Sequence, residues 1–311
     1  MDAGSPRNGL LATFTAGQAF PGLVVFDPMS GGIRWQVPSV DFGTVAWSPD
    51  GTRLAVVTPS EEGLTLYDAR GAGILSVGTV GGAAWSPDSS TLAVNLIDGL
   101  ALLPAEVGGE VQLIGPRWPA SELTWSPDGT SIVFSSTGTA FDPANPLVGE
   151  PPRHLYRLNV EDGAVTQLTD GPMIDHDPYF SPDGSQVIFK RTNAGTGGSE
   201  VFLTDGSGSF SSLGRVGWAA NPWSPDGELL LLADQEAVWI ATPGGEVIEI
   251  VARPHDTLAP IGQGWSPDGA FVLIAWQATL GDLITLEAVA VDGSQRLDLG
   301  TGYGASWQRL P

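Results

Sequence analysis

Two of the three histidines in this sequence stand beside carboxylates, and these side chains have the clearest capacity for chemistry. The first group is Asp175, His176 and Asp177, which we expect in a connection, residues 170–178, just before a strand, and the second is His255 with Asp256 in another connection. Imidazole and carboxylate groups bind divalent cations, so the first group is a candidate site for Ca²⁺ or Mg²⁺. No HExxH or EF-hand spacing supports a metal. The alternative is that the aspartates cap turns and the histidine accepts a hydrogen bond.

A second set of candidates combines aromatic and basic side chains that could contact a ligand or partner. Its members are Trp118, Arg153, His154, Trp218 and Trp276. Aromatic side chains at the rim of a pocket form platforms for sugars or protein side chains, and arginine can hold an anionic group. The alternatives are packing of the tryptophans between neighbouring sheets and local ion pairs for the arginine.

The largest insertion in the chain, residues 137–153, directly precedes His154 and is rich in proline. Loops of this length in compact proteins are usually functional or disordered. The segment could cover a binding site as a lid, present an edge to a partner, or be a decoration without a role. Its composition does not separate these alternatives.

The catalytic repertoire of the sequence is narrow. There is no cysteine, there is one lysine, Lys190, and no nucleophile stands in a recognisable arrangement with a base. Paired carboxylates could still serve a glycosidase, but sequence alone does not place two acids at the required separation. We therefore expect a protein without catalytic residues, and keep an enzyme as the alternative.

The charge of the chain restricts its partners. The net charge is -22, from 35 acidic and 13 basic residues, which disfavours binding to nucleic acid or to anionic lipid. A protein, or a small neutral or cationic ligand, remains as the expected partner. No apolar run approaches the ~20 residues that cross a bilayer, so we expect no direct membrane insertion, and we expect a monomer.

The elements that position these residues come from a repeat. The motif WSPDG, or a close variant, recurs with its aromatic residue at positions 47, 85, 125, 180, 223, 265 and 307, which gives spacings of 38, 40, 55, 43, 42 and 42 residues. Ser-Pro-Asp-Gly between two apolar runs is typical of a hairpin turn, and a period near 40–45 residues matches a four-stranded propeller blade. The aspartates of these turns are therefore structural.

A second series of glycine-containing turns, the first of them near residues 31–32, is out of phase with the aromatic series. The chain thus begins and ends partway through a blade. Residues 9–14, 23–28 and 33–38 should supply three strands, and residues 304–309 the missing inner strand. We predict an all-β fold, a seven-bladed β-propeller of four-stranded antiparallel blades closed by pairing of N-terminal strands with the C-terminal strand; the alternative is six blades. Residues 1–311 would form one domain, with a flexible N-terminus at residues 1–8.

The repeated WSPDG, each copy followed by an apolar strand, resembles the TolB-type family of propellers, also described as WD-like. The resemblance covers the chain from Ala46 to Trp307. It implies a bacterial binding or scaffolding module, often extracytoplasmic (periplasmic or at the cell surface), with a cytoplasmic location left open.

We expect such a module to engage a protein or small ligand on the loop-rich face around the central channel, where the candidate residues should gather. The alternatives are a lyase, lactonase or glycosidase acting in the channel, and a structural or sensor domain of a larger surface protein. The chain lacks the G-x-S-x-G nucleophile motif of the hydrolase domains found in peptidase members of this family.

Overall fold

Every element in the described part of the chain is a β-strand. The computed structural model describes residues 7–15, 22–38, 40–60, 63–139, 152–214, 221–234, 237–252, 260–277 and 284–310. Within these ranges no helix is present that is long and apolar enough to cross a membrane. The strands form seven antiparallel sheets, which divide between two compact units: residues 1–76 with 217–311, and residues 77–216.

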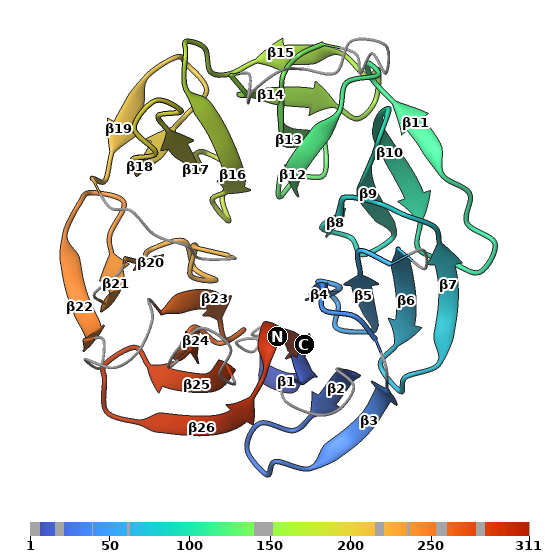
Figure 1. The fold of residues 1–311 in the computed structure, drawn as a ribbon, viewed down its shortest axis with the longest axis vertical. Coiled ribbons are helices and arrows are strands. Elements are labelled where there is room, and N and C mark those ends of the chain that lie inside the picture. The colour runs from blue at the N-terminus through green and yellow to red at the C-terminus, as the bar shows by residue number, and fades with distance from the viewer. Residues whose placement is uncertain are drawn as a thin grey trace, which may run out of the picture. The chain divides into compact units, whose positions relative to one another are not determined.

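The first unit contains four sheets (Figure 1), which have the strand orders β27-β1-β2-β3, β4 to β7, β20 to β22, and β23 to β26. In chain order the strands are β1 Arg7–Thr15, β2 Gly22–Phe26, β3 Ile33–Pro38, β4 Thr44–Trp47, β5 Arg53–Val57, β6 Leu64–Asp68, β7 Gly73–Val77, β20 Leu230–Ala233, β21 Ala237–Ala241, β22 Val247–Ala252, β23 Ile261–Trp265, β24 Phe271–Gln277, β25 Ile284–Ala290, β26 Arg296–Thr301 and β27 Tyr303–Leu310. The β20–β22 sheet has three described strands, and Trp223 adds an isolated bridge to Leu230.

The second unit contains three four-stranded sheets, β8 to β11, β12 to β15 and β16 to β19. Their strands are β8 Gly82–Trp85, β9 Thr91–Leu96, β10 Gly99–Pro104, β11 Gln112–Ile114, β12 Ala120–Trp125, β13 Ser131–Ser136, β14 His154–Asn159, β15 Val165–Gln167, β16 Ile174–Phe180, β17 Val187–Thr192, β18 Ser199–Thr204 and β19 Phe210–Ser212. The seven sheets are the blades of a seven-bladed β-propeller, so the prediction of seven blades is confirmed.

The predicted closure by the two ends of the chain is also confirmed. β27 pairs antiparallel with β1, with Leu11 opposite Trp307, and completes the sheet of β1, β2 and β3. The Trp307 indole donates to the Gly9 carbonyl at 3.3 Å, and the Gln308 amide donates to the Gly51 carbonyl at 2.7 Å. β1 begins at Arg7, so the last two residues of the segment predicted to be flexible, 7–8, belong to this strand. Residues 1–6 lie outside the described residues.

The repeated turn is built around its serine and aspartate. In the first copy the Ser48 hydroxyl donates to Asp50 at 2.6 Å and accepts the Arg53 amide at 3.0 Å, while Asp50 also accepts the Thr52 amide. Gly51 closes the turn at φ 70°, where glycine is unstrained. The copy that ends in serine instead of glycine places Ser89 at φ 63°. The motif therefore fixes a hairpin through side-chain hydrogen bonds as well as through Pro and Gly.

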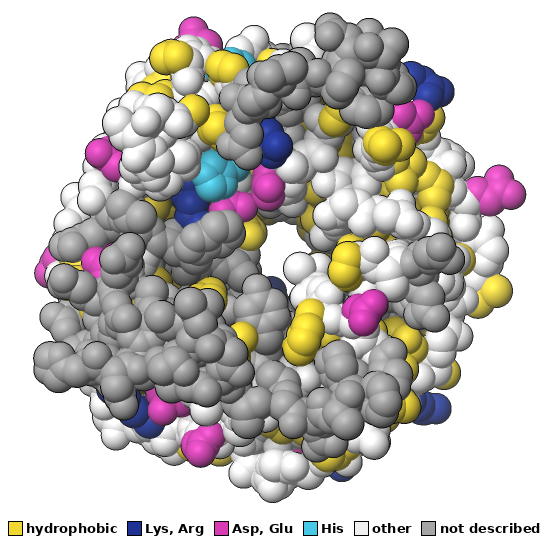
Figure 2. Space-filling view, in the orientation of Figure 1, with side chains coloured by type: hydrophobic (Ala, Val, Ile, Leu, Met, Phe, Trp, Pro, Cys, Tyr) yellow, Lys and Arg dark blue, Asp and Glu magenta, His cyan; other side chains and the backbone are white. Residues whose placement is uncertain are grey.

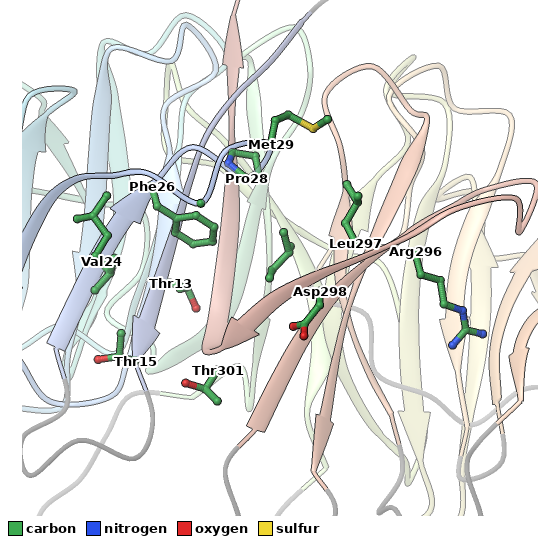
Figure 3. A pocket seen from close by; sticks show the side chains of 13 residues that line it. Thr13, Thr15, Val24, Phe26, Pro28, Met29, Arg296, Leu297, Asp298 and Thr301 are labelled. Carbon is green, nitrogen blue, oxygen red and sulfur yellow. The ribbon is translucent and has the colours of Figure 1, made fainter.

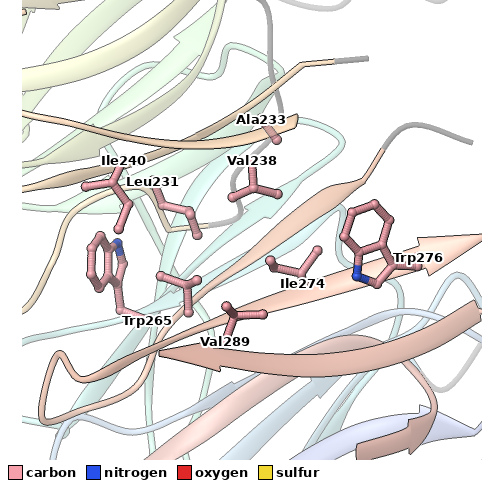
Figure 4. Close-up of a cluster of buried hydrophobic side chains, with 9 residues drawn as sticks. Leu231, Ala233, Val238, Ile240, Trp265, Ile274, Trp276 and Val289 are labelled. Atoms are coloured by element: carbon pink, nitrogen blue, oxygen red, sulfur yellow. The ribbon is translucent and has the colours of Figure 1, made fainter. Parts of the chain in front are cut away.

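The recurring aromatic residues are buried, and five of them, Trp47, Trp125, Phe180, Trp265 and Trp307, pack against residues of the preceding blade, as predicted. Figure 4 shows one such core in the first unit, where Trp265 packs with Leu231 and Ile240 of the preceding sheet. Its indole donates to the Pro222 carbonyl at 3.0 Å, so this large apolar side chain buries its one polar atom with a partner. Such cores hold each inner strand, and the residues beside it, in a fixed position.

Candidate functional site

Asp175, His176 and Asp177 lie in the inner strand β16. The sequence placed them in the connection before that strand, and this is corrected by the structure, in which β16 begins at Ile174. The pairing of β16 with β17 slips by one residue between His176 and Tyr179, and Asp177 has φ 52°. Such a bulge re-aims side chains at the rim of a sheet, and it turns Asp177 toward the neighbouring strand.

Asp177 is held between a lysine and a histidine. Its Oδ2 lies 3.1 Å from Lys190 Nζ and 3.3 Å from His176 Nδ1, and the exposed fractions of the Asp177, Lys190 and His176 side chains are 16%, 10% and 19%. His176 Nε2 lies 2.9 Å from the Thr192 hydroxyl. Burial acts to raise the pKa of Asp177, but the hydrogen bond from His176 and the charge of Lys190 outweigh it, and that pKa is lowered. Burial lowers the pKa of Lys190, against the attraction of Asp177.

Asp175 has a structural environment. Its side chain is fully buried, and both carboxylate oxygens bind Arg191, at 2.6 Å to Nε and 2.8 Å to Nη2. The hydrogen bond to Asp175 raises the pKa of Arg191, and the guanidinium also stacks 4.9 Å from the Phe210 ring. The Asp175 backbone joins two blades, because its amide donates to the Arg153 carbonyl and its carbonyl accepts the Ser135 hydroxyl. The Asp175–Arg191 pair therefore fixes this end of β16.

A further carboxylate enters the site from the preceding blade. Glu122 lies at a bulge in β12, has φ 27° and is exposed. Its charge acts on Lys190 and on Tyr179. Burial is the largest cause that raises the pKa of Tyr179, followed by the charges of Asp177 and Glu122.

The sequence did not single out Glu122, Lys190 or Tyr179 as site residues. The one feature of the sequence that could have drawn attention to this site is that Lys190 is the only lysine of the chain.

Arg153 and His154 join the same region at the start of β14. Arg153 Nη1 donates to the Ser121 hydroxyl at 3.2 Å, and no carboxylate of the described residues pairs with it. His154 Nδ1 is buried, and no described residue forms a hydrogen bond with it. Trp118 is half-buried and packs edge-on against Tyr156 of the sheet that it precedes, with ring centroids 5.2 Å apart. Arg153 thus presents a cation held by a neutral group, whereas Arg191 is ion-paired with Asp175.

We use the name charged cluster for the residues that β12, β14, β16 and β17 bring together, namely Glu122, Arg153, Asp175, His176, Asp177, Lys190 and Arg191. Figure 2 shows basic, acidic and histidine side chains gathered on the surface over β16 and β17. In the described ranges no group of three or more His, Asp or Glu side chains is arranged to hold a metal. Arg191 binds both oxygens of Asp175, and Lys190 and His176 share one oxygen of Asp177, so the two carboxylates predicted as ligands for Ca²⁺ or Mg²⁺ each contact basic side chains.

The remaining predicted residues do not join the charged cluster. Trp276 lies in the first unit, in a core cluster, where its exposed fraction is 6% and its indole donates to Glu287 at 3.1 Å (Figure 4). Trp218, His255 and Asp256 lie outside the described residues, as do residues 140–151 of the insertion.

Comparison with known proteins supports the fold. No profile of a known protein family matches the chain. An uncharacterized protein of Agrobacterium fabrum is 28% identical over 271 residues, 76% of this chain and 85% of that protein. A TolB homolog of Chlorobium luteolum is 23% identical over 45% of this chain, and an uncharacterized peptidase, YuxL, of Bacillus subtilis is 27% identical over 57%. These matches span 30% and 25% of the two longer proteins.

Solved structures give the same result over nearly the whole chain. The periplasmic gluconolactonase of Pseudomonas aeruginosa aligns with a TM-score of 0.62 and 18% identity, over 97% of this chain and 99% of that one. TolB from Acinetobacter baumannii aligns with a TM-score of 0.54 and 20% identity, over 96% and 82%. The dihydro-heme d1 dehydrogenase NirN aligns with a TM-score of 0.60 and 17% identity, over 97% and 77%. The chain thus has the β-propeller fold of these proteins, a fold that proteins with different activities share.

Proposed function

We propose that this propeller is a non-catalytic binding module, and that the charged cluster is its binding site for a protein or a small neutral or cationic ligand. The observation that supports this most directly is that the polar groups of the cluster are already bound to one another. Asp175 with Arg191, and Asp177 with Lys190 and His176, hold fixed geometries in a largely buried setting. A preorganised polar surface of this kind binds a ligand with little loss of side-chain freedom.

The protonation chemistry favours binding over catalysis. A general base works best when its pKa lies near the operating pH, and the pKa of Asp177 is shifted downward, away from neutrality. Asp175 is not accessible to a reacting group, because its side chain is fully buried and both of its oxygens bind Arg191. The groups left to contact a ligand are the exposed Glu122, with acceptors only, and the half-buried Arg153, with donors only.

The charge balance of the cluster fits a neutral ligand or a protein partner. Three carboxylates, Glu122, Asp175 and Asp177, stand with three basic side chains, Arg153, Lys190 and Arg191, in a chain whose net charge is -22. A locally neutral, hydrogen-bonding site in an acidic protein neither repels neutral ligands nor attracts anions. We further propose an extracytoplasmic, monomeric protein, in keeping with the periplasmic gluconolactonase and TolB among its structural neighbours.

The absence of cysteine allows a direct test. Glu122→Cys, labelled with a maleimide benzophenone, places a photo-crosslinker at the charged cluster, and Glu161→Cys places the same group at an exposed turn between β14 and β15. We expect one partner to be crosslinked from position 122 in extract of the source organism, and not from position 161. Unlabelled wild-type protein should compete, and an Arg153→Ala/His176→Ala variant should compete at least tenfold less well. Equal crosslinking from both positions would contradict the site.

The enzyme alternative has its own assay. Purified protein is incubated with glucono-δ-lactone, chosen because a gluconolactonase shares the fold. We expect hydrolysis at the buffer rate. Hydrolysis above that rate, abolished by Asp177→Asn in a protein that keeps its melting temperature, would replace the binding proposal with a lactonase.

A further inference from the structure

The repeat places two acidic residues at the same position of neighbouring blades. Glu122 and Asp177 each stand three residues before the recurring aromatic residue, Trp125 or Phe180. Each lies at a bulge in its inner strand and has a positive φ, of 27° and 52° respectively. The same position in β27 is Gly304, also at a bulge, with a φ of 64° that leaves glycine unstrained. The two acids therefore occupy a backbone position that costs a non-glycine residue free energy, and such strain is common at functional sites.

Within the sheet of β16 to β19, the carboxylate of Asp177 has its own counter-charges. His176 precedes it in β16, and Lys190 stands opposite His176 in β17. The His176 Nδ1 and Lys190 Nζ atoms lie 3.3 and 3.1 Å from Asp177 Oδ2. These three side chains show how a carboxylate at this position of the repeat holds an ammonium group.

The corresponding residues beside Glu122 are neutral. Ser121 precedes it in β12, and Ser135 stands opposite Ser121 in β13. The Glu122 side chain is exposed, and it forms no ion pair or hydrogen bond with any residue that the structure describes. Its charge acts on Lys190 and Tyr179 of the next blade, so the carboxylate lies on the side of β12 that meets β16 and β17. The third blade therefore carries the carboxylate of this arrangement without its ammonium group.

A cation without a counter-charge lies beside this free carboxylate. Arg153 Nη1 donates to the Ser121 hydroxyl at 3.2 Å, and the Cα atoms of Ser121 and Glu122 are ~3.8 Å apart as chain neighbours. The Arg153 backbone bridges to Ile174 at the start of β16, so Arg153 stands on the same side of its sheet. A half-buried guanidinium without a carboxylate is costly to desolvate, and an anionic group of a ligand would offset that cost. One acceptor-only group and one donor-only group of opposite charge are thus open side by side.

We propose that Glu122 and Arg153 bind a zwitterionic small molecule that carries an ammonium group and a carboxylate group, of which an amino acid is the simplest example. The ammonium group binds Glu122 as Lys190 Nζ binds Asp177, and the carboxylate binds the Arg153 guanidinium. A zwitterion has no net charge, so the field of a chain with net charge -22 does not repel it as it repels an anion. This inference rests on the proposed function, because it names the ligand of the charged cluster.

The test uses a series of ω-amino acids from glycine to aminocaproate, in which each added methylene group moves the ammonium and carboxylate groups further apart. Binding is measured by isothermal titration calorimetry, with butylamine and butyrate as probes that carry one charge each. We expect one chain length to bind more tightly than its neighbours, and at least tenfold more tightly than either singly charged probe, because it alone spans both side chains.

The variants assign this binding to the two residues. Glu122→Gln and Arg153→Gln should each weaken it at least tenfold, and Arg153→Gln should also remove the preference for the ω-amino acid over butylamine. Arg153→Lys keeps the positive charge and should retain part of the binding. The matched control is Glu161→Gln, at an exposed turn of the same unit, which should leave binding unchanged. Unchanged melting temperatures verify that the variants fold.

A second control excludes binding in the first unit. A cleft of about 490 Å³ between β2 and β26 has the volume of a ligand pocket, and its lining includes Arg296 and Asp298 (Figure 3). Arg296 has a carboxylate 3.9 Å away, that of Glu287, and Asp298 stands opposite Glu287 in the pairing of β25 with β26. Asp298→Asn should therefore leave binding unchanged. Binding that Asp298→Asn abolishes and Glu122→Gln leaves intact would place the ligand in this cleft and overturn the proposal.

Two further results would overturn the proposal and leave the proposed function standing. In the first, butylamine binds as tightly as every ω-amino acid, which would leave Arg153 without a role although the charged cluster binds a cation. In the second, no member of the series binds, while the crosslinker at position 122 still captures a partner. If the crosslinker captures nothing either, the proposed function fails as well.

Discussion

The contact between the first repeated turn and the closing strand can be tested with two glycines that differ in one respect. Gly51 and Gly129 occupy the same position of two Trp-Ser-Pro-Asp-Gly turns, with φ 70° and 72°. A Cβ on Gly51 would overlap the backbone carbonyl oxygen of Arg309 in β27, whereas the nearest atom to a Cβ on Gly129 is Pro87 Cδ at 3.8 Å. Gly51→Ala thus disturbs β27, and Gly129→Ala does not.

The expected magnitudes follow from these geometries. Both variants place alanine in the left-handed region, which costs roughly 1–2 kcal/mol. Gly51→Ala must in addition displace β27 or its own turn, and overpacking of this kind costs about 1–3 kcal/mol. We therefore expect a loss of about 1–2 kcal/mol for Gly129→Ala and about 2–5 kcal/mol for Gly51→Ala.

The assay is guanidinium unfolding followed by tryptophan fluorescence and far-UV circular dichroism, with stability compared through the midpoint and slope of each transition. Coincident transitions from the two probes show that the comparison is valid. Equal midpoints for the two variants would refute the reasoning, because they would mean that β27 yields at no cost and does not hold the sheet of β1 in place.

Three further predictions concern single features. Ser89→Gly should raise the unfolding free energy by about 0.5–1 kcal/mol, because Ser89 holds a φ of 63° where the other Ser-Pro-Asp turns have glycine. The gain should appear as a higher denaturant midpoint, and a lower midpoint would show that the Ser89 side chain matters more than its backbone strain. Lys190→Met should lower the free energy of unfolding by about 2–4 kcal/mol, because it leaves the mostly buried Asp177 without its cation. In a double-mutant cycle, Lys190→Met/Asp177→Asn should recover most of that loss, and additive losses from the two changes would contradict the pairing. The pKa of Asp128 is lowered by hydrogen bonds from the Ser126 hydroxyl and the Thr130 amide. The contribution of Asp128 to stability is therefore present above its ordinary pKa of 3.8 and is lost as the pH falls through the lowered pKa. Asp128→Asn should flatten the acid limb of a plot of stability against pH, and an unchanged limb would argue against this hydrogen bonding.

The fold could be predicted from the sequence because its signals are local. The Ser-Pro-Asp-Gly turn forms through contacts within a few residues, as the bonds of Ser48 to Asp50 and Arg53 show. The spacing of the turns then sets the length of each blade. The pairing of β27 with β1 could also be inferred, because two series of turns were out of phase by part of one blade.

The candidate site was harder to predict because it depends on where two strands slip. If the pairing next to the β16–β17 turn continued along both strands without a bulge, Lys190 would lie opposite Asp177, and Arg191 opposite His176. In the structure Lys190 stands opposite His176 and Arg191 opposite Asp175. The bulge at Asp177 shifts each partner by one residue, and its local signal is Pro178 within β16, because proline inside a sheet is confined to edges, strand starts and bulges. Glu122 was missed for the same reason, since it enters the site through a bulge in β12.

The pairing of β1 with β27 has a consequence for how the protein is made. Leu11 meets Trp307 across the sheet, so the two are separated along the chain by nearly its whole length. At ribosomal rates of about 5–20 residues per second, β1 waits roughly 15–60 s for this neighbour. Throughout that time β2 and β3 can pair with β1 on one side while its other edge stays open, and an open edge can join the strands of another nascent chain. Overproduction at low temperature, or with chaperones in excess, should therefore raise the soluble yield more than any change to the mature surface.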